Sequence, residues 1–241
     1  MNVIGCGRIG SYIAKVSKAK TFSRSEKLAD FEAGPIVIAT RNDDLEKILK
    51  EIPKNRFSDL VFIQNGMYQP VLDKYGISEC TKVLIYFAIQ NKGDKPVDGK
   101  GTVVTGKHGI SIKQLLNKNE IDASLLKEDQ FNIVMFEKLL WNCVFGLLCR
   151  VYNKNVGDLV QAHRDEIEKL TEELSAIIAE KENVQMPFDT SEKLCDYSMK
   201  ISDYIGDVKE WSWRNGWFWD YKQTDLHSKL LGLANLDFNY Q

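Results

Sequence analysis

The pattern of hydrophobic and polar positions divides the chain into two parts. Up to about residue 114, short β-branched and aliphatic runs alternate with amphipathic stretches and polar turns. Beyond that point the apolar positions recur at helical spacing to the C terminus. Short buried runs separated by helical segments are typical of a parallel sheet covered by helices. We therefore predict an α/β domain over residues 1–115 and an all-helical domain over residues 116–241.

Individual elements follow from the same pattern. One predicted helix of the N-terminal part ends near residue 50. Asn42 or Asp43 should be its N-cap, because either side chain can accept a hydrogen bond from a free backbone N–H. We expect strands at 2–4, 20–24, 35–40, 60–64 and 82–89, a further strand at 101–106 on the sheet edge, and long helices at 131–152, 156–181 and 191–221.

Composition sets limits on the kind of protein. Of the 241 residues, 27% are charged and 44% hydrophobic, which is ordinary for a globular chain. A net charge of −2 gives no electrostatic reason to expect nucleic acid or an anionic membrane as a partner. The five cysteines form no Cys-x-x-Cys pair and the three histidines are scattered, so we expect neither a metal site nor a disulfide scaffold.

We expect a cytoplasmic protein, with an organelle left open. The N terminus enters a strand-and-glycine pattern at once, without a basic segment followed by an apolar one, which disfavours a secretory signal. The apolar run 131–152 has the length of a membrane span. However, Glu137, Lys138 and Asn142 interrupt it near its centre, so we interpret it as a core helix.

A dinucleotide-binding fingerprint opens the chain. The short strand 2–4 is followed by Gly5-Cys6-Gly7-Arg8-Ile9-Gly10 and then by a helical segment. In a G-x-G-x-x-G turn the first glycine permits the tight turn, the second lets the backbone approach a pyrophosphate, and the third lets helix and strand pack closely. The anion would lie at the helix N terminus. A chance glycine-rich turn is the alternative explanation. Together with the strand pattern, the motif predicts a Rossmann-like domain.

Three further positions are candidates for binding the cofactor. Arg24 follows the second predicted strand, where an arginine favours NADP and an acidic residue favours NAD, so nearby Glu26 keeps NAD open. Arg41 and Asn65 each follow a buried strand, and ligands bind at the carboxyl edge of such sheets. The alternatives are an exposed structural arginine at Arg24 and an ordinary Asn-Gly turn at Asn65.

The apolar run 131–152 contains two polar residues that need an explanation. Lys138 and Asn142 are four residues apart, so both lie on one face of the predicted helix. Burying an ammonium group is costly unless it is paired or functional. Alternatively, Lys138 extends to the surface or pairs with Glu137, and Asn142 satisfies backbone groups.

An aromatic-rich segment lies near the C-terminal end, at 211–221. Its aromatic residues cover more than one helical face, and therefore part of this surface could contact a homodimer partner or another protein. Simple burial in the core is the alternative.

Taken together, four motifs resemble the ketopantoate reductase family. They are the glycine loop at 5–10, Gln64-Asn65-Gly66-Met67, Lys138-Leu139-Leu140-Trp141-Asn142-Cys143, and Glu210 with Asn215-Gly216. The resemblance covers most of the chain. It implies an N-terminal Rossmann domain, a C-terminal helical domain used for substrate binding and dimerisation, and an active site in the cleft between the two.

The resemblance also implies roles for single residues. Lys138 matches the lysine of the family's K-x-x-x-N motif, the proposed general acid, and Glu210 matches a glutamate that binds the substrate hydroxyl. Asn142, Ser198 and Asn65 match substrate-side residues, and Asn65 would also contact the cofactor. Arg41 resembles a basic residue near the cofactor. The implied activity is NADPH-dependent reduction of a small 2-keto acid, with hydride transfer from the nicotinamide.

The chain departs from the family pattern at several points. The stretch from Gly10 to Arg41 is short, so a strand and a helix beside the adenine half of the cofactor are missing. Two family asparagines are replaced by Gly146 and Cys195. These losses leave a second hypothesis open, namely a degenerate, non-catalytic family member that binds a nucleotide or takes part in an assembly.

Overall fold

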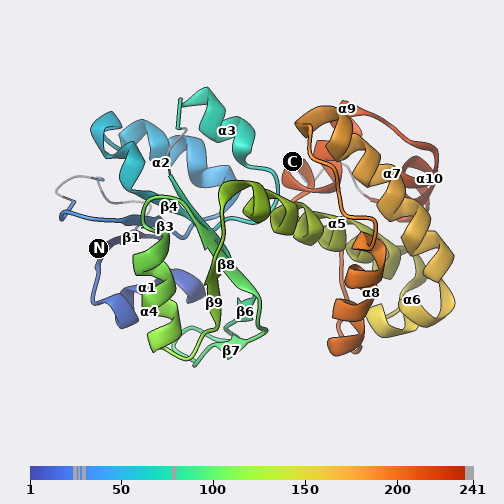
Figure 1. Ribbon diagram of the computed structural model, residues 1–241, viewed down its shortest axis with the longest axis horizontal. Helices are drawn as coiled ribbons and strands as arrows, with labels where there is room; N and C mark the ends of the chain where they lie inside the picture. Colours follow the sequence, from blue (N-terminus) through green and yellow to red (C-terminus); the bar gives the residue numbers. More distant parts are fainter. Residues whose placement is uncertain (24–25, 27, 29–30, 78–79, 237–241) are drawn as a thin grey trace. The chain divides into compact units, whose positions relative to one another are not determined.

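The computed structural model describes residues 1–23, 26, 28, 31–77 and 80–236 (Figure 1). The chain divides into two compact units, Met1–Phe131 and Asn132–Gln241. This division lies later in the chain than the boundary we predicted after residue 115. The reason is that the segment after that boundary adds the last strand of the sheet to the first unit.

The N-terminal unit is built on a mixed sheet with the strand order β2-β1-β3-β4-β5-β8-β9. All neighbouring pairs are parallel except β5 with β8, so the predicted α/β class with a mainly parallel sheet is confirmed. The strands are β1 (Asn2–Ile4), β2 (Lys20–Phe22), β3 (Ile36–Ile38), β4 (Leu60–Phe62), β5 (Thr81–Leu84), β8 (Thr102–Thr105) and β9 (Ala123–Leu125), with β6 (Phe87–Ala88) and β7 (Val97–Asp98) forming a separate hairpin.

Helices cover both faces of this sheet (Figure 1). α1 and α4 lie on one face, and α2 and α3 on the other. The helical elements of this unit are α1 (Arg8–Ser17), α2 (Leu45–Glu51), α3 (Gln69–Lys74), α4 (Gly109–Lys118) and the 3-10 turns η1 (Asn42–Asp44) and η2 (Lys54–Asp59).

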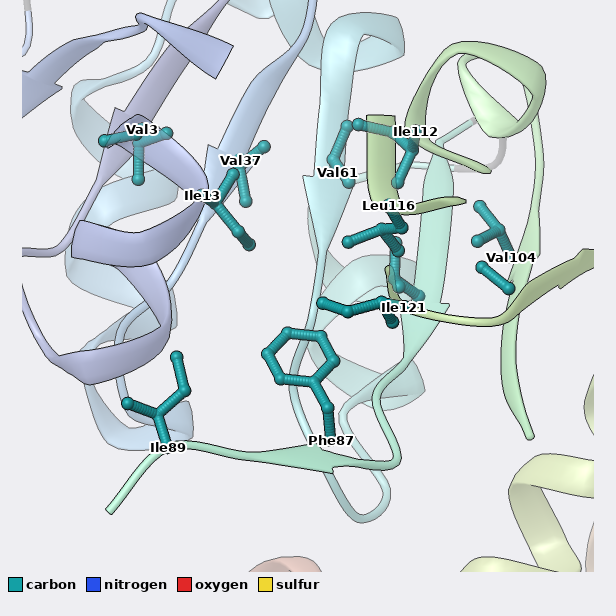
Figure 2. Packing of buried hydrophobic residues seen from close by; sticks show 13 residues of the cluster. Val3, Ile13, Val37, Val61, Phe87, Ile89, Val104, Ile112, Leu116 and Ile121 are labelled. Carbon is teal, nitrogen blue, oxygen red and sulfur yellow. The ribbon is translucent and has the colours of Figure 1, made fainter. Parts of the chain in front are cut away.

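The sheet core follows from the alternation of side chains along each strand. Val3, Val37 and Val61 are the central residues of three adjacent parallel strands, and the register places them side by side. They share a buried cluster with Ile13 of α1 and Ile112 of α4 (Figure 2). Their neighbours in sequence face the opposite side, because successive strand residues alternate between the two faces. Both faces are therefore apolar, as a parallel sheet requires.

Three local predictions for this unit were wrong. The strand at 101–106 is not at the sheet edge, because β9, which the pattern missed, pairs with it in parallel. The run 82–89 divides into β5 and β6. Neither Asn42 nor Asp43 is the N-cap of α2; Asp44 takes that position, and its side chain does not cap the helix.

The sheet ends early on the β2 side. In the common dinucleotide-binding order, two strands lie beyond the first on this side. Among the residues that the structure describes, β2 alone lies beyond β1. The side chain of Asn2 holds the connection from β2 to β3 in place, because it exchanges hydrogen bonds of 2.9 and 3.0 Å with the backbone of Glu32.

The C-terminal unit is helical. The predicted helix 131–152 is present as α5, whereas the prediction 156–181 divides into α6 and α7. The prediction 191–221 was wrong in its middle, because residues 201–210 carry no helix. The elements are α5 (Glu128–Tyr152), whose first turn belongs to the N-terminal unit, α6 (Val156–Ala162), α7 (Arg164–Glu182), α8 (Thr190–Lys200), η3 (Trp211–Trp213), α9 (Asn215–Tyr221) and α10 (Asp225–Leu233).

The break after α8 has a clear packing cause. The segment around Gly206 crosses α5 at Gly146, where a side chain on Gly146 would collide with the backbone of that segment and one on Gly206 would make a tight contact at 3.2 Å. A Cβ at Gly146 would lie 2.7 Å from the carbonyl oxygen of Asp207. Glu210 then adopts the left-handed conformation, with φ of 50°, before η3 begins.

Part of the aromatic segment 211–221 belongs to the core, and Trp211, Trp213 and Trp219 are half-buried. Trp217 and Phe218 are buried, and Lys181 lies over the Trp217 ring, 4.1 Å from its centroid. Tyr221 is 41% exposed and is the main aromatic side chain of the segment that faces solvent. A role of this segment in a homodimer or another assembly stays a prediction.

One helix of the described chain, α5, is long and apolar enough to cross a membrane by length and composition. Within that apolar stretch, 56% of the residues are buried inside the protein. The central helix of a globular domain satisfies the same criterion.

The glycine loop gives a matched pair of stability predictions. A Cβ at Gly10 would lie 2.1 Å from the carbonyl oxygen of Gly5, whereas a Cβ at Gly7 would meet nothing within 4 Å. We expect Gly10→Ala to lower the free energy of unfolding by about 1–3 kcal/mol through overpacking, despite the higher helix propensity of alanine. Gly7→Ala should change it by less than about 0.5 kcal/mol. Urea denaturation measures both, and equal stability of the two variants would contradict the predicted packing.

Candidate functional site

The glycine loop between β1 and α1 has the shape that binding of an anion requires. Gly5 has a φ of 108°, and a Cβ on it would lie 2.5 Å from the carbonyl oxygen of Ala39. Gly10 packs against Gly5, whereas Gly7 faces open space. α1 begins immediately after Gly7 without a side-chain cap, so its first N–H groups remain available. These groups and the helix dipole fit the pyrophosphate of a dinucleotide.

The two other predicted loop residues, Arg8 and Ile9, hold the loop in place. The Nη1 atom of Arg8 donates to the carbonyl oxygens of Ile89, at 3.1 Å, and Gln90, at 3.0 Å. Ile9 is partly buried and packs against the sheet core. The surface that remains for a ligand is therefore mainly backbone.

The carboxyl ends of β3 and β4 form a second part of the same edge. The side chain of Gln64 donates to the carbonyl oxygens of Ile38, at 3.0 Å, and Thr40, at 3.2 Å. Asn42 donates to the backbone carbonyl of Asn65 at 2.7 Å. These bonds tie the two loops together and fix the backbone of Asn65. The sequence analysis missed the roles of Asn42 and Gln64, although their position after buried strands was the available signal.

The predicted residues that choose between cofactors are only partly described. Arg24 lies outside the described residues. Arg41 follows β3 with an exposed side chain, so its guanidinium can meet an anion from solvent. The carboxylate of Glu26 accepts a hydrogen bond from the backbone N–H of Ser23, which lowers its pKa.

In the helical unit, Lys138 and Asn142 lie one turn apart on α5, as predicted. The Asn142 amide nitrogen donates to the backbone carbonyl of Lys138 at 2.8 Å. This bond fixes the amide orientation and leaves its oxygen as the acceptor for another group. Glu137, which we considered as a partner of Lys138, lies 3.5 Å from the Lys193 ammonium.

The environment of Lys138 shifts its acid–base chemistry. Burial is the largest cause, the nearby Arg214 guanidinium acts in the same direction, and Glu210 opposes them; together they lower the pKa of Lys138 to about 7. A lysine with a pKa near neutrality can both hold and release a proton at physiological pH. Glu210 is thus one of the groups that set this pKa, which brings two of the predicted catalytic residues together.

Arg214 was missed by the sequence analysis. Its Nη2 atom lies 2.5 Å from a carboxylate oxygen of Glu210, and its side chain is only 13% exposed. The following residue, Asn215, is held by a 2.9 Å hydrogen bond between its amide oxygen and Nε2 of the buried His227. The signal that could have revealed Arg214 is a cation inside an aromatic run, the same signal that identified Lys138.

Ser198 is placed differently from the other predicted substrate-side residues. Its hydroxyl accepts a hydrogen bond from the Trp141 indole nitrogen at 2.9 Å and donates to the carbonyl oxygen of Leu194 at 2.9 Å. The residue is fully buried. Within the described structure, this hydroxyl holds α8 against α5.

The two residues that replace family asparagines, Gly146 and Cys195, are both packed against other parts of the chain. The space beside Gly146 is taken by the backbone at Asp207. Cys195 is buried, and burial raises the pKa of its thiol. Among the described residues, no cluster of three or more His, Cys, Asp or Glu side chains could hold a metal ion.

A glycine loop at the point where the strand order reverses defines a dinucleotide-binding fold. In this chain, that fold is followed by a helical domain that carries a lysine of lowered pKa. The helical part matches the model of the ketopantoate reductase PanE/ApbA C-terminal domain over residues 130–210. This match confirms the resemblance to the ketopantoate reductase family. The matched range contains Lys138, Asn142, Ser198 and Glu210.

Solved structures of such proteins share the fold. The 2-dehydropantoate 2-reductase from Methylococcus capsulatus superposes with a TM-score of 0.72 at 15% identity over 98% of both chains. A dimeric ketopantoate reductase from Staphylococcus aureus gives 0.71 at 15% identity, over 97% of this chain and 96% of that one. D-mandelate dehydrogenase in a complex with NADH gives 0.68 at 14% identity, over 97% and 96%. A sequence search of curated proteins found no significant match.

The lowered pKa of Lys138 predicts a pH-dependent stability. Its folded-state pKa of about 7 lies below its ordinary value of 10.5, so between these values the unfolded chain binds a proton that the folded chain lacks. The free energy of unfolding should therefore rise from pH 7 to pH 10, and the penalty for the buried ammonium is complete below pH 7. Lys138→Met should flatten this rise.

Urea denaturation at pH 7, 8 and 9 measures this effect. Lys169→Met, which replaces an exposed lysine of α7, is the matched control for losing a lysine. The same pH slope in the wild type and in Lys138→Met would show that Lys138 does not titrate in this range.

Proposed function

We propose that the protein is an NADPH-dependent reductase of a small 2-keto acid, with Lys138 as the general acid. The observation that carries this proposal is the buried Lys138, whose pKa of about 7 is influenced by the charges of Glu210 and Arg214. The same chain has a glycine loop of the dinucleotide-binding type. The family match over residues 130–210 supports the choice of reaction class. Ketopantoate and related 2-keto acids are the substrates to test first.

The chemistry of reduction explains why these residues suit the task. A bound nicotinamide supplies the hydride to the keto carbon. Negative charge then develops on the keto oxygen, and an ammonium group there stabilises the charge and delivers a proton. Lys138 holds that proton near neutral pH, and Glu210 keeps the ammonium form accessible. Asn142 offers an amide oxygen one helical turn from Lys138, which can orient a substrate hydroxyl or the ammonium itself.

Residues of the N-terminal unit would hold the cofactor. The backbone at Gly5, Gly7 and Gly10 fits a pyrophosphate, and the braced loops at Arg41 and Asn65 lie at the same sheet edge. An exposed guanidinium at Arg41 favours the additional phosphate of NADP. NADP is therefore the proposed cofactor, with NAD as the alternative that Glu26 keeps open.

Cofactor binding tests the first half of this proposal. Titration of the purified protein into NADPH, and separately into NADH, should change the cofactor fluorescence at micromolar concentration. Gly7→Ala should weaken this binding without loss of stability, because the new methyl group would occupy the open space beside the loop. No binding at millimolar NADPH would reject the reductase and favour a non-catalytic interaction protein.

Catalysis tests the second half. Lys138→Ala should reduce kcat for NADPH oxidation with a 2-keto acid by about two to four orders of magnitude, the usual contribution of a general acid. NADPH affinity should change little, and Lys169→Ala should retain full activity. A reduction of kcat of less than about threefold in Lys138→Ala would remove this residue from the general-acid role.

A further inference from the structure

A 2-keto acid carries a carboxylate that its enzyme must bind, and several groups suited to this purpose are already engaged in this chain. Both hydrogen-bonding functions of Ser198 are used, by Trp141 and Leu194. The position of Gly146 is covered by the backbone of Asp207. Of the predicted asparagine and serine side chains of the helical unit only Asn142 is left, and its amide nitrogen already donates one hydrogen bond to the Lys138 carbonyl.

Arg214 has the positive charge and the unused hydrogen-bond donor that a carboxylate requires. Its guanidinium is largely buried, with only 13% of the side chain exposed, and its one close ion pair uses Nη2. The Nε atom is buried and has no hydrogen-bond partner among the described residues. An unsatisfied buried N–H of a charged group is costly, so such a donor is expected to have a partner in the functional state. A carboxylate matches the planar fork of a guanidinium better than any other small anion except phosphate.

The placement of Arg214 agrees with this role. It lies at the junction of η3 and α9, immediately before Asn215, which the buried His227 fixes. Its charge acts on Lys138 and on Cys143, both on α5. An anion bound to Arg214 would therefore be close to the proposed proton donor.

We propose that Arg214 binds the carboxylate of the substrate, and that the substrates are 2-keto acids that need no distal hydroxyl. This inference rests on the proposed function. The carboxylate of Glu210 is already paired with Arg214, so Glu210 serves to hold the guanidinium instead of binding a substrate hydroxyl. A carboxylate at Arg214 would also offset the positive charge that opposes protonation of Lys138. Substrate binding would thus favour the ammonium form that must donate the proton.

The inference can be tested with oxamate, a 2-keto acid analogue that hydride transfer does not reduce. We expect Arg214→Gln to raise the dissociation constant of oxamate by about 10- to 100-fold, the loss of one or two charge-assisted hydrogen bonds. Arg214→Lys should restore part of the affinity. Arg150→Gln, which removes an exposed arginine of α5, is the matched control and should bind oxamate like the wild type. Calorimetry in two buffers of different ionisation enthalpy should detect proton uptake on oxamate binding in the wild type, and less in Arg214→Gln.

Kinetics separate this inference from the proposed function. If the wild type reduces a 2-keto acid, Arg214→Gln should raise KM for the acid by at least about tenfold and KM for its methyl ester by less than about threefold. An unchanged acid-to-ester ratio, or oxamate affinity within twofold of the wild type in folded Arg214→Gln, would overturn the assignment. If the wild type binds oxamate through Arg214 but reduces no keto acid, the carboxylate site stands and the reductase proposal fails.

Discussion

The helical unit depends on the cost of placing an ammonium group within the apolar helix α5. Burial and Arg214 both disfavour the charged form of Lys138, and Glu210 opposes them. Burial and these two charges together set the proton affinity of Lys138, and the segment after α8 supplies both charged residues.

The N-terminal unit depends on a different constraint, the close approach of backbone to backbone. Gly5 and Gly10 leave no room for a methyl group, whereas Gly7 leaves space for a ligand. The neighbouring loops are held by Asn42 and Gln64, so the chain's own hydrogen bonds fix the carboxyl edge of β3 and β4. Among the described residues, β2 is the one strand that lies beyond β1 on the other side of the sheet.

The sequence predicted those features that have local signals. The glycine spacing and the apolar run of α5 are two such signals, and both elements are present. β9 has no strand pattern of its own and forms because β8 supplies a partner. The break in 191–221 was missed because the aromatic residues of this stretch recur at helical spacing. In addition, Glu210 adopts a left-handed conformation, which a sequence usually signals with a glycine. The pairing of Glu210 with Arg214 had a local signal that the sequence analysis did not use, because the two residues are four apart in the chain.

The contact between Gly146 and the segment around Gly206 also bears on how the protein can change. Main chain of the two segments meets at this contact, with the Cys149 side chain beside it, so a side chain added at Gly146 would have to displace the backbone at Asp207. An asparagine at position 146 would therefore require the segment at Asp207 to move. Side-chain variation around this part of α5 is therefore easier at residues such as Arg214 and Asn142, which can change while the backbone stays in place.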